Sequence, residues 1–94
     1  MAVSQETAET LALRALEWLI GNDELLPVFM GATGAGIDDL RTGAGDPAFL
    51  GAVLDFLLMD DQWIIAFCDL HAVPYERLMH ARAALPGGDV AHWT

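Results

Sequence analysis

The sequence contains no lysine. It has four arginines and 14 aspartates and glutamates, so the formal net charge at pH 7 is −10. Proteins that bind duplex nucleic acid or an anionic membrane use many basic side chains to displace counterions from the phosphates. A chain this acidic is repelled by both surfaces at long range. We therefore expect neither a membrane nor nucleic acid as its main partner.

Cysteine and uncharged apolar runs are equally scarce. Cys68 is the single cysteine, which excludes an internal disulfide and suits a reducing compartment. The most apolar stretch, residues 48–70, is interrupted by Asp55 and by the pair Asp60 and Asp61, which a membrane span would have to bury. The first ten residues carry acids where a secretory signal carries basic residues followed by an apolar run. These features predict a cytoplasmic protein.

No stretch alternates apolar and polar residues, which is the pattern of a half-buried strand. Apolar residues recur at helical spacing instead, and the segments are separated by helix start and stop signals. The clearest start is Asp46 before Pro47, an N-cap residue followed by a first-turn proline. The predicted helices span 5–20, 22–30, 38–42, 47–59, 62–71 and 74–85. The expected fold is all-α, a compact bundle of five or six helices.

Two similar segments come into register when the chain is slid against itself by 38 positions. The stretch ALEWLIGNDELLPVFM then lies beside VLDFLLMDDQWIIAFC without a gap. Amphipathic helices match at apolar positions by chance, but here an acidic–aromatic pair and an Asn/Asp–Asp turn match as well. We predict two diverged three-helix repeats, at about 8–45 and 46–86, within one domain over 1–86, and a flexible tail at 87–94. The alternative is two unrelated helical hairpins of similar composition.

The apolar content is high for so short a chain, at 54% of 94 residues. A domain of this size has room for one core, which we expect to contain Leu16, Leu19, Phe29, Leu50, Leu54, Leu57, Ile64, Phe67 and Leu78. The remaining apolar residues would supply an interface. We predict a small non-enzymatic interaction or adaptor domain with an exposed apolar surface around Trp18, Met59 and Trp63. Its partner would be another protein or a second copy, in a homodimer.

Most of the acids lie at predicted helix starts, where they cap backbone N–H groups and oppose the helix dipole. Glu17 and Asp55 do not, and they occupy matching positions of the predicted repeat. Two carboxylates at a shared site would bind a cation or divide the work of an acid and a base. The alternative is that each marks the solvated stripe of a mostly buried helix.

Two further patterns resemble functional motifs only in part. Cys68 and His71 have the spacing of two metal ligands on a helix, and Asp69 and His80 lie nearby, but structural zinc takes four ligands and no second pair exists. The glycines of GATGAG at 31–36 resemble a phosphate loop, but there is no lysine and two aspartates follow. We predict no catalytic residue, no metal ligand and no cofactor.

The last two predicted helices, joined by a short turn, have the outline of a helix-turn-helix. Arg77 and Arg82 would lie on its second helix. Phosphate contacts usually need more basic groups than this chain contains, and other three-helix units share the outline without touching DNA. A degenerate helix-turn-helix regulator is therefore an alternative to the interaction domain.

Five segments together resemble a known family: LALRALEWL, DELLPVFMGATG, DDLR, DPAFLGAVLDFLLMDD and the closing ARAALPG. The chain is similar to short alphaproteobacterial proteins that form a domain family of unknown function. The resemblance spans residues 8–87, and residues 46–61 are its most specific part. It implies a helical fold and brings no activity, cofactor or site residue with it.

Overall fold

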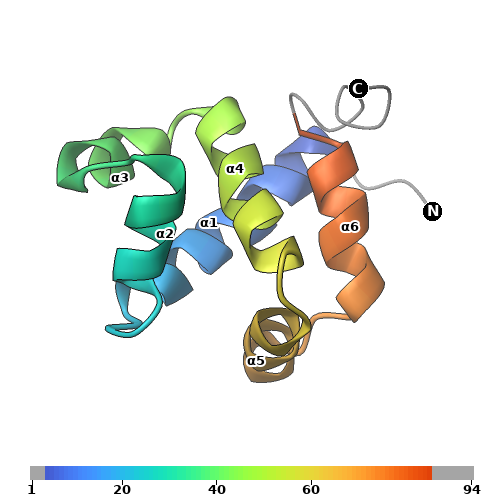
Figure 1. Cartoon of the computed structure of the whole chain (residues 1–94). Helices are drawn as coiled ribbons and strands as arrows, with labels where there is room; N and C mark the ends of the chain where they lie inside the picture. Colours follow the sequence, from blue (N-terminus) through green and yellow to red (C-terminus); the bar gives the residue numbers. More distant parts are fainter. Residues whose placement is uncertain (1–3, 86–94) are drawn as a thin grey trace.

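A computed structural model describes residues 4–85, which form six α-helices and contain no strand (Figure 1). The helices are α1 (Gln5–Ile20), α2 (Leu26–Thr33), α3 (Ile37–Gly43), α4 (Pro47–Leu58), α5 (Asp61–His71) and α6 (Tyr75–Ala83). The all-α fold predicted from the sequence is confirmed. No helix within 4–85 has the length and apolar character needed to cross a membrane. The predicted tail at 87–94 lies outside the described residues.

Side-chain caps set several of the helix starts. Ser4 accepts a hydrogen bond from the backbone N–H of Thr7 at 3.1 Å, and Asp46 accepts one from Ala48 at 3.0 Å. Asp60 does the same for Gln62 at 2.8 Å. These bonds satisfy N–H groups that have no partner within the helix, and so each start is fixed by neighbouring residues alone.

The second helix begins and ends later than its sequence signals suggest. The side chain of Asn22 accepts hydrogen bonds from the N–H groups of Glu24 and Leu25, so this turn precedes α2 rather than opening it. Gly31, which follows the predicted end of this helix at residue 30, lies inside α2. The helix ends at Gly34, whose φ of 75° is the left-handed conformation that glycine adopts without steric cost.

The centre of the molecule is the packing of α1 against α4, with α6 lying against both of them (Figure 1). On α1, Ala8, Ala12, Ala15 and Leu19 follow one another at helical spacing and are fully buried. Three alanines in one stripe let neighbouring helices approach closely. Eight of the nine predicted core residues are buried, and the ninth, Ile64, is partly buried against the core.

Pairs of aromatic contacts relate the two halves of the chain. The rings of Trp18 and Phe67 meet edge to face at 5.8 Å, and those of Phe56 and Phe29 do so at 5.2 Å. Phe56 and Phe67 stand 38 positions after Trp18 and Phe29, so each half contributes the equivalent ring to the other's contact. Reciprocal contacts of this kind are what a pseudo-twofold axis produces. They support the predicted repeat, which stays a prediction.

Gly43 is required where the end of α3 meets α4. A Cβ atom at this position would overlap the ring of Phe49, which in turn lies edge to face against Phe29 at 6.0 Å. We expect Gly43→Ala to lower the free energy of unfolding by about 1–2 kcal/mol, because the ring has to move within a packed core. Urea unfolding followed by circular dichroism measures the change.

Gly31→Ala is the matched control for that experiment. A Cβ at Gly31 meets nothing within 4 Å, so the same substitution inside α2 should be neutral or stabilise by up to about 1 kcal/mol. Equal effects of the two substitutions would contradict the close approach at Gly43.

Candidate functional site

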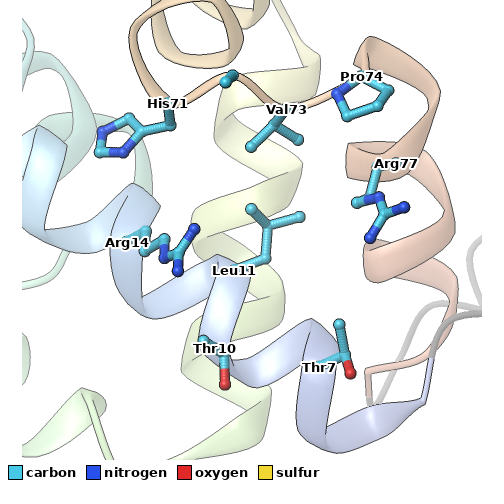
Figure 2. Close-up of a pocket in the computed structure, with 9 residues that line it drawn as sticks. Thr7, Thr10, Leu11, Arg14, His71, Val73, Pro74 and Arg77 are labelled. Carbon is cyan, nitrogen blue, oxygen red and sulfur yellow. The ribbon is translucent and has the colours of Figure 1, made fainter.

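Two hollows lie side by side on the surface of α1. The first, here called the α1–α6 hollow, has a volume of about 430 Å³ and lies between α1, the α5–α6 turn and the start of α6 (Figure 2). Its lining consists of Thr7, Thr10, Leu11, Arg14, His71, Ala72, Val73, Pro74 and Arg77. Basic and hydroxyl groups therefore surround a floor that is partly apolar.

The second, here called the α1–α5 hollow, is shallower and has a volume of about 630 Å³. It is lined by Arg14, Glu17, Trp18, Gly21, Asn22, Asp23, Glu24, Leu70 and His71. Leu70 is 69% exposed there, although it is a large apolar residue. Arg14 and His71 line both hollows and so form the boundary between them.

The turn between α5 and α6 shapes the boundary. Ala72 ends α5 in the left-handed conformation, with φ 57°, and the N–H of Val73 donates to the carbonyl of Cys68 at 2.9 Å. This reversal brings residues 71–74 over α1. The ring of His71 packs on that of Phe67, with centroids 4.7 Å apart, which fixes its place at the boundary.

The three residues predicted to form an exposed apolar surface occupy different environments. Trp18 is half-buried against Phe67, and Trp63 is half-buried and stacked on Phe56 with ring centroids 4.5 Å apart. Both tryptophans therefore contribute to the edge of the core. Met59, at the end of α4, is 72% exposed and lines neither hollow on α1.

Glu17 and Asp55, the predicted carboxylate pair, have different surroundings. Glu17 lines the α1–α5 hollow, and Asp55 is not among the residues there. Asp55 instead accepts two hydrogen bonds from the guanidinium of Arg82, at 2.5 Å from Nε and 3.0 Å from Nη2. These two hydrogen bonds join α4 to α6. A cation at Asp55 would have to compete with a guanidinium that is already in place.

We expect the Asp55–Arg82 pair to contribute modestly to stability. The carboxylate is 57% exposed and the arginine side chain 14%, so water screens one partner. A double-mutant cycle with Asp55→Asn and Arg82→Gln should give a coupling of about 0.5–1 kcal/mol that shrinks at high salt. Zero coupling at low salt would mean that the two side chains do not interact in solution.

The arrangement of α6 bears on the helix-turn-helix alternative. Residues five apart on an α-helix are separated by about 140° around its axis. Arg82 accordingly pairs with α4, whereas Arg77 lines the hollow beside α1. The two arginines do not share one DNA-facing side, which weakens this alternative without testing it.

Cys68 lies in the core and not on a reactive surface. It is 1% exposed, and no three His, Cys, Asp or Glu side chains within residues 4–85 lie close enough to hold a metal ion. Burial raises the pKa of its thiol above the ordinary value of 9.0, and the charge of Asp69 raises it further. Asp69 also accepts a hydrogen bond from the hydroxyl of Tyr75 at 2.8 Å, which raises the pKa of Tyr75. A protonated, buried thiol is a poor nucleophile.

This environment predicts slow thiol chemistry in the folded state. At pH 8, Cys68 should react with Ellman's reagent on the order of 100-fold more slowly in buffer than in concentrated urea. In buffer, the reagent reaches the thiol only when the surrounding structure unfolds locally. Equal rates would place the thiol at the surface.

The raised pKa of the Cys68 thiol also predicts that the stability of the fold depends on pH in the alkaline range. The pKa of Cys68 in the folded state lies above the unfolded value of 9.0. The contribution of the thiol to the free energy of unfolding is therefore fully present below pH 9.0, and it is lost as the pH rises through the folded pKa. The free energy of unfolding should therefore fall above pH 9.0, less so in Cys68→Ala.

The fold and these hollows define a small helical domain whose candidate sites are open depressions on the surface of a packed bundle. The chain belongs to the family DUF3572, described as a protein of unknown function, whose model matches residues 5–88. The resemblance seen in the sequence is thereby confirmed. Neither a curated protein nor a solved structure matches the chain.

Arg14 and Leu70 were missed as site residues. Arg41 and Arg82 lie near helix ends, where a cation interacts with the dipole, but Arg14 lies in the middle of α1 and has no such role. The position of Arg14 in the middle of a predicted helix was the signal in the sequence that this arginine could line a site. Nothing in the sequence near Leu70 separates it from the apolar residues that face the core.

Proposed function

We propose that this protein is a non-enzymatic interaction domain that binds a segment of another protein in the α1–α5 hollow. The observation that carries the proposal is Leu70, 69% exposed beside the half-buried Trp18 in a concave part of the surface. A large apolar side chain gains about 1.5–3 kcal/mol when it is fully removed from water. Tryptophan is among the residues that contribute most to protein interfaces.

The charges around this hollow favour a basic partner. Glu17, Asp23 and Glu24 line it, and the whole chain carries a net charge of −10. A segment with one apolar side chain against Leu70 and neighbouring lysines or arginines would complement both features. A second copy of the same acidic chain would meet like charges here, so the proposed partner is a different protein.

Two observations support the absence of an enzymatic role. The one thiol in the chain is buried and protonated, and it lines neither hollow. Asp55, half of the predicted carboxylate pair, is held by Arg82.

A displayed library of random peptides tests the proposal. The wild-type domain should enrich peptides in which an apolar residue neighbours lysine or arginine, and Leu70→Ser should weaken their binding at least about tenfold. Since Leu70 is exposed, the substitution leaves the core intact. Met59→Ser is the matched control: Met59 is similarly exposed, at 72%, but lies outside the hollow.

Three results would overturn the proposal. One is no enrichment at all, another is peptides that bind Leu70→Ser as well as wild type, and the third is self-association through Leu70. Light scattering at several protein concentrations detects the last of these, and a homodimer lost in Leu70→Ser would show that a second copy occupies the hollow.

A further inference from the structure

The α1–α6 hollow gathers positive charge in a chain that has very little of it. Two of the four arginines line it, together with His71, and none of the acidic residues within 4–85 does. Of the other two arginines, Arg82 is engaged by Asp55, and Arg41 lies on α3. Among the described residues, this basic lining is therefore a local exception to the negative charge of the chain.

The two arginines reach the hollow from different helices. Figure 2 shows the Arg14 side chain, from α1, and the Arg77 side chain, from α6, on either side of Leu11. Within residues 4–85 neither guanidinium has a hydrogen bond or an ion pair. Two like charges that line one hollow repel, and an anion bound between them would reduce that repulsion.

The remaining lining suits an anion that has a carbon body. Thr7 Oγ1 accepts a hydrogen bond from Ser4, which leaves its own proton available for a ligand. Leu11 and Val73 provide an apolar floor between the basic groups (Figure 2). The volume of about 430 Å³ lies within the range of about 300–1,000 Å³ typical of small-molecule sites.

We infer that the α1–α6 hollow binds a small organic anion whose phosphate or carboxylate group lies between Arg14 and Arg77. The planar guanidinium group matches both oxyanions, because its parallel N–H groups donate to two oxygens at once. The carbon body of the ligand packs on Leu11 and Val73. This inference goes beyond the proposed function and does not rest on it.

Nitrogen-labelled protein and NMR test the inference directly. The four arginines give four side-chain Nε–Hε signals, which single Arg→Gln variants assign. Inorganic phosphate, phenyl phosphate and succinate are the probes, each titrated at constant ionic strength with sodium chloride. The signals of Arg14 and Arg77 should move together with one saturating dissociation constant, and the signal of Arg41 should not move.

The choice among probes identifies the ligand chemistry. Phenyl phosphate should bind more tightly than inorganic phosphate if Leu11 and Val73 contact the carbon body. Tighter binding of phenyl phosphate than of succinate identifies a phosphate ligand, and the reverse order identifies a carboxylate ligand.

Arg14→Gln and Arg77→Gln should each weaken binding by about tenfold, the loss expected from one charged hydrogen-bonding group. Arg41→Gln is the matched control, because it removes the same charge from α3, outside the hollow, and should leave the affinity unchanged. The inference fails if no probe saturates, if all four signals drift in parallel, or if Arg41→Gln weakens binding as much as the other two variants. Peptide capture through Leu70 is a separate measurement, so either proposal can fail alone.

Discussion

The packing of α1 against α4 is the constraint on which the rest of this small domain depends. The fully buried stripe of Ala8, Ala12, Ala15 and Leu19 lets neighbouring helices approach α1 closely. The opposite side of α1 is exposed and polar, and the two hollows lie on it. Trp18 on α1 contacts α5 through Phe67, and Phe56 on α4 contacts α2 through Phe29. The long pair thus fixes where α2 and α5 lie.

This arrangement also determines where the two hollows form. The α6 helix packs on both long helices, and the α1–α6 hollow forms where α1 faces the α5–α6 turn and the first turn of α6 (Figure 2). The left-handed Ala72 and the packing of His71 on Phe67 fix that turn. The hollows are therefore consequences of core packing, because the buried Phe67, which lines neither hollow, holds His71 at the boundary between them.

The helices could be predicted from the sequence because their signals are local. Asp46 and Asp60 cap the N–H groups two residues further on, and such bonds form whatever the rest of the chain does. The sites could not be predicted in this way. The α1–α6 hollow joins Arg14 to Arg77, residues far apart in the chain whose proximity depends on tertiary packing. Helical periodicity likewise does not distinguish Trp63, which stacks on Phe56, from an exposed tryptophan.

The shared lining of the two hollows has an energetic consequence. Arg14 lies beside Glu17 and the other acids of the α1–α5 hollow, and its charge partly offsets theirs. An anion bound between Arg14 and Arg77 would neutralise that charge from the other side. The acids would then attract a basic partner segment more strongly, and by reciprocity the bound segment would strengthen anion binding by the same factor. Removing Arg14 would weaken this coupling, because Arg14 is the arginine that lines both hollows.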